Sequence, residues 1–279
     1  MEMKSKVLIA GGTGYLGKRL VKASLGQGHE TYVLYRPEIG VDIEKLSVQF
    51  PVSIFRSHQI LLQLKLVDAI KEAGNVKRFL PSEFGTDPAK MENAMEPGRV
   101  TFDDKMVVRK AIEEAGIPFT YVSANCFAGY FLGGLCQPGH IIPSREHVSI
   151  LGSGEEKAIY VDEDDIATYT IMAIDDPRTL NKTLYILPPR NILSQREVVQ
   201  IWEKLIGKEL RKSSISSEEF LASMREQDYA EQVGLTHYYH VCFEGCLTKF
   251  EIGDEGEEAS KLYPKVKYTT VEEYMKRYL

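Results

Sequence analysis

Three glycines with the spacing G-x-x-G-x-x-G, at Gly11, Gly14 and Gly17, follow a short apolar run near the start of the sequence. In a strand–turn–helix unit, the first glycine permits the tight turn, the second lets the backbone approach a pyrophosphate, and the third allows close helix packing. Free N–H groups at the start of the following helix then attract phosphates. This context predicts a dinucleotide site rather than an empty glycine-rich turn. The candidate binding residues are Gly11, Gly12, Thr13, Gly14, Tyr15, Leu16 and Gly17.

The end of the second predicted strand indicates which dinucleotide would bind. An acidic residue there would hold the ribose 2′-hydroxyl of NAD, whereas this chain has Arg36 followed by Pro37. A cation suits a 2′-phosphate, so the sequence predicts NADPH as cofactor. Lys45 could reach the same phosphate. A solvated surface side chain is the alternative for both cations, and it weighs more for Lys45 because lysines are common on helix surfaces.

A lysine near the start of a later helix is the candidate catalytic base. Lys105, in T-F-D-D-K-M-V-V-R-K, follows the loop P-S-E-F-G-T-D-P. Ligands of open α/β sheets bind outside the carboxyl ends of the strands, where such a helix start can face them. Arg109 lies one turn on, along the same helix face. A partly desolvated lysine beside a cation has a lowered pKa and can act as a general base, although the residues alone favour a surface lysine slightly.

Two further motifs carry weaker signals. His237, in the aromatic stretch G-L-T-H-Y-Y-H, could hydrogen-bond a phenolic substrate, with a structural histidine as the alternative. The pair Tyr263 and Lys267 matches the Tyr-x-x-x-Lys pattern of short-chain dehydrogenases by letters, but Pro264 lies inside it. Because proline disrupts a helix, we interpret that match as a coincidence.

No metal site is predicted. The carboxylates of Asp162–Asp165 stand where a helix begins, so capping and the helix dipole explain them, and no His or Cys lies beside them. The cysteines are too few for a disulfide scaffold and lack zinc-site spacing. Reduced thiols in a cytosolic protein are therefore expected at Cys126, Cys136, Cys242 and Cys246.

The pattern of elements predicts an α/β protein. Strand 6–10, helix 15–27 and strand 31–36 form a βαβ unit in which strand 6–10 is expected to be buried. Alternation then continues with helix 59–73, strand 77–81, helix 103–115 and strand 118–123. This predicts a Rossmann-type doubly wound parallel sheet.

The pattern loosens near residue 125, which we predict to separate two domains. Residues 1–125 would form the NADP-binding Rossmann domain, and residues 126–279 a smaller C-terminal α+β substrate domain, with interleaving of the two domains as an alternative. The expected C-terminal helices cover about 162–174, 194–207, 216–226, 228–242 and 269–278.

Composition narrows the function classes. The 279 residues include 34 Lys and Arg against 40 Asp and Glu, a formal charge of −6. A binder of nucleic acid or of an anionic membrane would need a basic excess. No apolar run is long enough to span a membrane. The first apolar run is also too short for a signal peptide and leads directly into the glycine turn.

Several strings together resemble the plant isoflavone reductase-like group, an NmrA-type branch of the atypical short-chain dehydrogenases. They are G-G-T-G-Y-L-G with Arg36, F-L-P-S-E-F-G-T-D-P, the F-D-x-K helix and S-A-N-C-F-A-G-Y-F. The subgroup of pinoresinol–lariciresinol reductases is favoured by S-A-N-C-F-A-G-Y-F, V-D-E-D-D-I-A-T-Y-T, D-P-R-T-L-N-K-T, F-E-G-C-L-T and A-S-K-L-Y-P-K-V-K-Y. The resemblance runs nearly from end to end.

The resemblance implies roles for particular residues. Lys105 matches the family's catalytic lysine, Arg109 and Lys45 match NADP contacts, and His237 matches a position associated with substrate. Segments that flank the nicotinamide in such proteins contain Ser82, Phe84 and Phe127. The implied reaction is NADPH-dependent opening of the benzylic ether of a phenolic furofuran lignan, in a homodimer. Alternatives are a phenylcoumaran benzylic ether reductase, an isoflavone reductase, or a non-catalytic NADP-binding regulator.

One departure from the family is expected to matter. Members of the group carry roughly another strand, helix and strand before R-S-H-Q-I, whereas this chain has only the short join L-S-V-Q-F-P-V-S-I-F, around residues 48–56. A connection this short can hardly supply two sheet strands. The sequence therefore predicts an incomplete sheet, and an inactive shortened variant is a further alternative.

Overall fold

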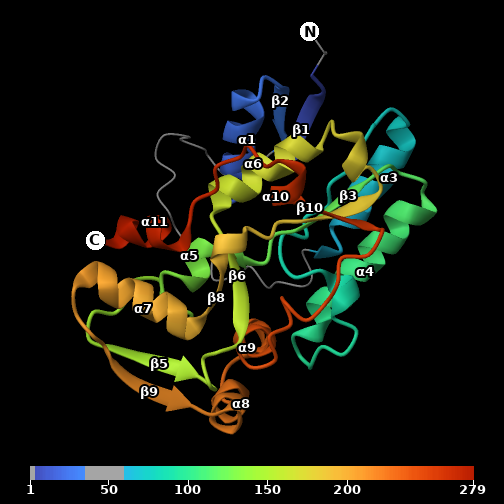
Figure 1. Cartoon of the computed structure of the whole chain (residues 1–279). Helices are drawn as coiled ribbons and strands as arrows, with labels where there is room; N and C mark the ends of the chain where they lie inside the picture. The colour runs from blue at the N-terminus through green and yellow to red at the C-terminus, as the bar shows by residue number, and fades with distance from the viewer. Residues whose placement is uncertain (1–3, 35–59) are drawn as a thin grey trace.

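The computed structural model describes residues 4–34 and 60–279. Its first unit is β1 (Lys6–Ala10), α1 (Gly17–Gly26) and β2 (Glu30–Leu34), with the two strands parallel and Lys6 opposite Glu30. This confirms the predicted βαβ unit. Helix α1 packs on α6 (Glu163–Ala173), which comes from the second half of the chain (Figure 1).

The expectation that strand 6–10 is buried is wrong. Leu8 is 67% exposed and Leu34 is 51% exposed, whereas Ile9, on the opposite face of β1, is only 7% exposed. Leu8 lies opposite Tyr32 in the strand pair, so one apolar face of the pair is open. The reason is that β1 and β2 form a sheet of two strands, and nothing within residues 4–34 and 60–279 covers this face.

A second parallel sheet has the order β10 (Gly256–Glu258), β7 (Lys182–Tyr185) and β3 (Thr120–Ser123). Strand pairing therefore crosses the predicted domain boundary at residue 125. The predicted strand 77–81 is reduced to one bridge between Phe79 and Phe119. The Phe79 amide and carbonyl are both bonded, but Pro81 has no N–H with which to extend the ladder.

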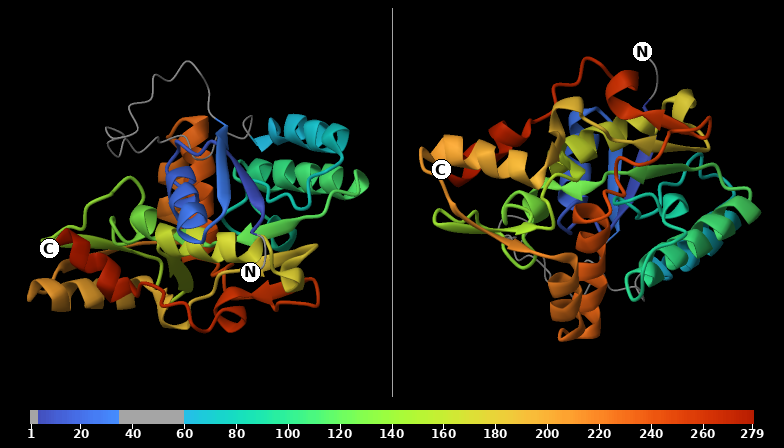
Figure 2. Two further views of the ribbon diagram at one scale, coloured as in Figure 1. Left: turned by 90° about the horizontal axis from the view of Figure 1, so that it is seen from above. Right: turned by 60° about the horizontal axis from the view of Figure 1, so that its bottom comes forward.

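Two helices pack beside this sheet. They are α3 (Gln63–Ala73) and α4 (Arg99–Glu114), which share a small core with Tyr121 of β3. Figure 2 shows α3 and α4 together on one side of the molecule, with α7 (Gln195–Ile206) and α11 (Val271–Met275) on the opposite side. The long helix α4 is the element that carries the candidate base.

The main core lies in the second half of the chain. Strand β6 (Lys157–Val161) pairs with β4 (Cys126–Phe127) and β8 (Ile192–Ser194), and β5 (His147–Leu151) pairs with β9 (Arg211–Ile215). The fully buried Trp202 belongs to the core that these strands share with helices α6 and α7. The remaining helices are α5 (Ala128–Phe131), α8 (Ser217–Arg225), α9 (Tyr229–Cys242) and α10 (Ala259–Leu262).

Helix starts in the second half follow the local sequence closely. Ser194 and Ser216 close capping boxes with glutamates three residues on, and Asp162 caps α6 by accepting from the Asp164 amide. The expected capping role of the acidic run is thus confirmed. Single 3₁₀ turns complete the chain at Pro88–Lys90, Pro177–Thr179, Pro189–Asn191 and Lys276–Tyr278.

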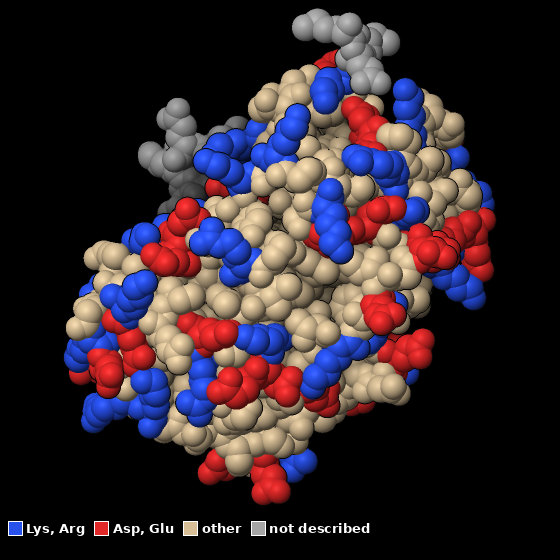
Figure 3. All heavy atoms as spheres, viewed as in Figure 1, with Lys and Arg blue, Asp and Glu red and all other residues tan. Residues whose placement is uncertain are grey.

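The visible surface carries both signs of charge, and the cysteine thiols are unpaired. Figure 3 shows basic and acidic side chains interspersed over the visible face, without a continuous basic stripe. All four cysteines are free, and burial raises the pKa of Cys136 and of Cys246 to about 12. Among the described helices, none has the length and apolar character needed to cross a membrane.

Candidate active site

The glycine turn has the compact form that a pyrophosphate requires. Gly11 has φ +75° and its amide donates to the Leu34 carbonyl at 2.9 Å, while the Gly14 amide donates to the Gly11 carbonyl at 2.9 Å. A Cβ at Gly17 would lie 2.1 Å from the Gly11 oxygen, so the turn closes directly on the start of α1. The turn therefore fits a dinucleotide held by backbone N–H groups at a helix start.

Buried hydrogen bonds tie this turn to the second half of the chain. The Tyr15 hydroxyl donates to Glu163 Oε1 at 2.9 Å, and the Gly129 amide donates to the same oxygen at 2.9 Å. The Tyr274 hydroxyl donates to Oε2 at 3.3 Å. Burial raises the pKa of Glu163, which has no exposed surface. A single carboxylate at the start of α6 thus positions the turn, α5 and α11 together.

Lys105 lies on α4 and is partly buried against the loop that follows Pro81. Its Nζ donates to the Glu83 carbonyl oxygen at 3.0 Å and approaches Gly85. Burial lowers the pKa of Lys105, and the charge of Arg109 lowers it further, against the opposing effects of Glu83 and Asp87. A desolvated amine with a lowered pKa has the property that a general base needs.

Arg109 lies one turn from Lys105 but is occupied by carboxylates. Its Nε and Nη2 donate to the two oxygens of Glu83 at 2.8 and 2.5 Å, and Nη2 also lies 2.9 Å from Asp87 Oδ1. The guanidinium stacks over the Tyr121 ring at 4.2 Å. It is only 5% exposed. Its groups are thus bonded to protein partners, and the NADP contact implied by the family resemblance remains a prediction.

The structure brings His237 and Lys105 into one site. The His237 ring nitrogen Nε2 lies 3.0 Å from the Thr101 hydroxyl, and its ring packs edge-on against Phe102 at 4.8 Å. Burial lowers the pKa of His237 to about 3, and the charge of Lys105 contributes. His237 is therefore a neutral imidazole near neutral pH and can only exchange hydrogen bonds with a substrate.

An aromatic row connects the glycine turn to the helix that carries His237. Tyr15 and Tyr130 lie 5.3 Å apart between ring centroids, and Phe131 stacks on Tyr238 at 4.7 Å. The Tyr238 hydroxyl also donates to the Tyr130 carbonyl. The aromatic side chains of α5 and α9 are thus neighbours.

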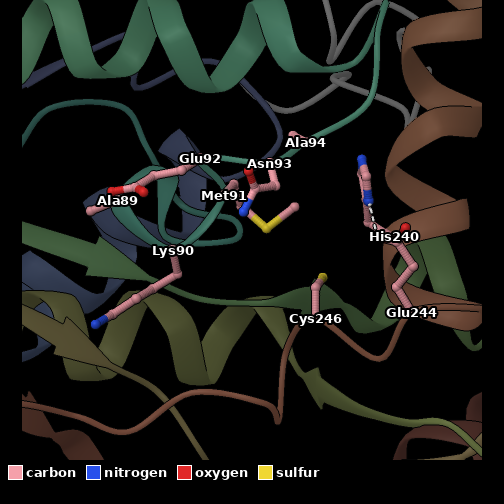
Figure 4. Close-up of a pocket in the computed structure, with 9 residues that line it drawn as sticks. All are labelled: Ala89, Lys90, Met91, Glu92, Asn93, Ala94, His240, Glu244 and Cys246. Carbon is pink, nitrogen blue, oxygen red and sulfur yellow. Dashed lines mark hydrogen bonds and ion pairs between the residues drawn. The ribbon is translucent and has the colours of Figure 1, made fainter.

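A cavity of about 360 Å³ lies beyond this region, between the loop Ala89–Ala94 and the end of α9. Figure 4 shows His240 turned toward Glu244 at its edge. The Met95 amide donates to His240 Nε2 at 3.0 Å, and Nδ1 bonds Glu244. Both ring nitrogens are therefore satisfied within the protein, so His240 is a structural histidine.

Other predicted residues are placed as follows. Arg36 and Lys45 lie outside the described residues. The Ser82 amide donates to Gln63 Oε1 at 2.6 Å, and Phe84 has the unusual φ of +36° in the loop below Lys105. Tyr263 lies past the end of α10 and bonds Asp176, so it shares no helix with Lys267. Within residues 4–34 and 60–279, no group of three potential metal ligands is found.

Sequence reasoning missed Glu83 and Asp87. Both stand in the loop P-S-E-F-G-T-D-P, which was singled out only for its position after a strand. Two carboxylates four residues apart, facing a helix with cations at i and i+4, are a signal that could have found them. The pairing joins positions 26 residues apart, between Glu83 and Arg109, and so depends on tertiary structure.

Comparisons with known proteins agree with this arrangement. The model of the NmrA-like family matches residues 43–275. "Bifunctional pinoresinol-lariciresinol reductase 2" of Linum usitatissimum is 73% identical, over 99% of this chain and 94% of the relative. A solved structure described as "AtPrR2 with NADP+ and (+)pinoresinol" is 51% identical with a TM-score of 0.91, over 100% of both chains. A crystal structure of isoflavone reductase is 36% identical with a TM-score of 0.85, over 99% of this chain and 100% of the other.

The fold and the glycine turn define an α/β protein of the Rossmann type. The chain belongs to the NmrA-like family. The match to the Linum relative spans 310 positions, whereas this chain has 279 residues, so at least 31 positions of the matched region have no counterpart here.

Proposed function

We propose that the chain is an NADPH-dependent reductase that opens the benzylic ether of furofuran lignans, converting pinoresinol to lariciresinol and then to secoisolariciresinol. The observation that carries the proposal is the 73% identity to a pinoresinol–lariciresinol reductase over nearly the whole chain. The site supports it, because a desolvated amine at Lys105 lies near His237, and the helix α9 that carries His237 also carries Tyr238 of the aromatic row. The identity to isoflavone reductase is much lower, which disfavours that sister activity.

The glycine turn, Lys105 and His237 have separate roles in the proposed reaction. The turn from Gly11 to Gly17 would hold the pyrophosphate of NADPH, which supplies the hydride. Lys105, whose pKa is lowered by burial, takes the phenol proton of the lignan when its amine is unprotonated. The resulting phenolate expels the benzylic ether oxygen as an alkoxide, which takes a proton from the solvent, and a quinone methide is left. Hydride addition to its benzylic carbon restores a phenolate, which recovers the proton from Lys105. Neutral His237 is placed to orient the substrate by a hydrogen bond.

Product analysis tests the function directly. The purified chain is incubated with racemic pinoresinol and NADPH, and the products are separated on a chiral column. We expect lariciresinol, followed by secoisolariciresinol. Parallel assays with a phenylcoumaran and an isoflavone separate the sister activities. Binding of NADPH without turnover of any of the three substrates would favour the regulator or the inactive shortened variant.

The choice of dinucleotide gives a prediction at Arg36. Replacing Arg36 with Asp is expected to weaken NADPH binding by about tenfold or more, because a charge-assisted contact to the 2′-phosphate becomes a repulsion. NADH has no 2′-phosphate, so its affinity is expected to change little. Fluorescence titration of both cofactors measures the difference, and equal losses for NADPH and NADH would refute the 2′-phosphate role.

The anchor of the glycine turn gives a second prediction. Three donors converge on the Glu163 carboxylate. Glu163→Gln keeps the size of the side chain but replaces one acceptor oxygen with an NH2 donor, so at least one of these hydrogen bonds is lost. An unsatisfied buried group costs about 1–3 kcal/mol, so we expect NADPH affinity to fall by roughly tenfold. Glu114→Gln, which changes an exposed carboxylate, is the control. If Glu163→Gln bound NADPH as tightly as the wild type, Glu163 would not be needed to position the glycine turn.

Assembly is proposed from the family resemblance, the compartment from the cysteines, and the domain division from the sequence pattern near residue 125. We expect a cytosolic homodimer, and light scattering during size-exclusion chromatography measures its mass. The division into residues 1–125 and 126–279 is also retained as a proposal.

The shortening near residues 48–56, outside the described residues, would account for the open face of β1 and β2. Restoring the relative's segment should then cover Leu8, which hydrogen exchange on β1 would detect.

A further inference from the structure

Lys105 faces a buried group of charged side chains to which the proposed reaction assigns no role. Glu83 accepts two hydrogen bonds from Arg109, and Asp87 lies 2.9 Å from the same guanidinium. The Tyr185 hydroxyl donates to the other oxygen of Asp87. We call Glu83, Asp87, Arg109 and Tyr185 the clamp. Tyr185 is the last residue of β7, and the other members lie on α4 and on the loop below Lys105.

We propose that the clamp positions Lys105 and stabilises the ammonium that forms when Lys105 takes the substrate proton. The proposal rests on the proposed function of Lys105 as the base. Its members do not touch the reacting atoms, so they are positioning residues. It also assigns to Arg109 a role that needs no contact with NADP.

Glu83 connects the clamp to Lys105. Its backbone carbonyl accepts from Lys105 Nζ at 3.0 Å, while its side chain is fixed by both nitrogens of Arg109. The next residue, Phe84, has φ +36°, a backbone conformation that non-glycine residues rarely adopt. Such a conformation persists only where surrounding contacts determine it. The bidentate ion pair therefore fixes the carbonyl that aims the Lys105 amine.

The net charge of the clamp and Lys105 changes when Lys105 takes a proton. Glu83 and Asp87 carry two negative charges against the single positive charge of Arg109. Burial lowers the pKa of Lys105, and while its amine is neutral the group has one unmatched negative charge. Once Lys105 accepts a proton, the four charges balance. The clamp therefore favours the product of the proton transfer over its starting state.

The remaining groups facing Lys105 do not disturb this balance. His237, from α9, stays neutral because burial lowers its pKa to about 3. Burial also raises the pKa of Tyr121 and of Tyr185, so both remain uncharged. The protonation of Lys105 is thus set by Glu83, Asp87 and Arg109 together with desolvation.

Two substitutions should move the pH profile in opposite directions. Activity of a general base rises with pH as the amine loses its proton. Glu83→Gln removes a negative charge, so the rising limb of kcat with pinoresinol should move to lower pH. Arg109→Gln removes the positive charge, so the limb should move to higher pH. Each shift should be on the order of one pH unit, as for charges within a few ångströms of a titrating group.

Matched controls lie on the same helix. Lys110 and Glu114 form an exposed pair with side chains 75% and 68% exposed. Lys110→Gln and Glu114→Gln make the same charge changes at the surface and should leave the limb in place. Arg109→Lys restores the charge without the bidentate geometry. It should bring the limb back toward the wild-type pH while kcat stays reduced.

Arg109→Gln leaves two buried carboxylates without their cation, so its folding needs a safeguard. Asp87→Asn is the milder variant, because asparagine can still accept from the Ala89 amide as Asp87 does at 3.1 Å. Asp87→Asn should move the rising limb of kcat to lower pH, as Glu83→Gln does. Retained NADPH binding identifies the variants that fold.

A second measurement does not depend on turnover. Acetic anhydride reacts with the neutral amine, so the pH dependence of Lys105 acetylation, read by peptide mass spectrometry, reports its protonation directly. The acetylation midpoint should move as the kinetic limb does. If the wild type fails to reduce lignans while these midpoints still shift, the proposed function fails and the clamp stands. If the variants lower kcat without moving either midpoint, the clamp is only structural and the proposal is overturned.

Discussion

Replacing Lys105 with methionine is expected to reduce the turnover of pinoresinol by about a hundredfold to ten-thousandfold, the usual contribution of general base catalysis. Methionine keeps a long flexible side chain but cannot accept a proton. The Lys105 amine donates to the Glu83 carbonyl, so its loss removes this hydrogen bond from the loop. Steady-state kinetics with saturating NADPH measures the effect.

The same variant should leave the cofactor site intact. The glycine turn is anchored through Glu163 and Tyr15, whereas the Lys105 amine donates to the Glu83 carbonyl, so NADPH affinity should stay within a few fold of the wild type. Lys110→Met, five residues further along α4 and exposed, provides the matched control. Unchanged turnover in Lys105→Met would remove this residue as the base, whatever its contacts.

The features that sequence predicted well are those fixed by local interactions. The glycine turn, the start of α1 and the capped helices α6 and α7 depend on residues within a few positions of one another. Burial of β1 was predicted wrongly for the opposite reason. An apolar strand becomes buried only when other elements cover it, and the elements that would cover Leu8 are not given by its own sequence.

The same distinction holds in the candidate site. Spacing alone placed Arg109 on the face of α4 that carries Lys105, and the structure brings both to one loop. Neither composition nor periodicity could reveal that Glu83 and Asp87 occupy the guanidinium, because those contacts need the loop to fold back against α4. The closeness of His237 to Lys105 likewise depends on α9 packing against the start of α4, through Thr101.

Gly17→Ala should have the second large effect, through backbone geometry alone. The added Cβ would lie 2.1 Å from the Gly11 oxygen and 2.8 Å from the Gly12 Cα, and neither backbone atom can yield as a flexible side chain would. Displacing Gly11 would also disturb its bond to the Leu34 carbonyl. Overpacking of this kind costs about 1–3 kcal/mol, so we expect a loss of NADPH affinity of roughly tenfold to a hundredfold.

Gly26→Ala is the matched control, because it makes the same change at the other end of α1. Nothing lies within 4 Å of a Cβ at Gly26, and alanine is the better helix former by about 0.5–1 kcal/mol. This variant should therefore bind NADPH normally and unfold at the same temperature or slightly higher. If Gly17→Ala also bound NADPH like the wild type, the close approach of the helix to the turn could not be what shapes the cofactor site. The contrast between two glycines of one helix thus isolates backbone packing from helix propensity, because only Gly17 meets backbone atoms.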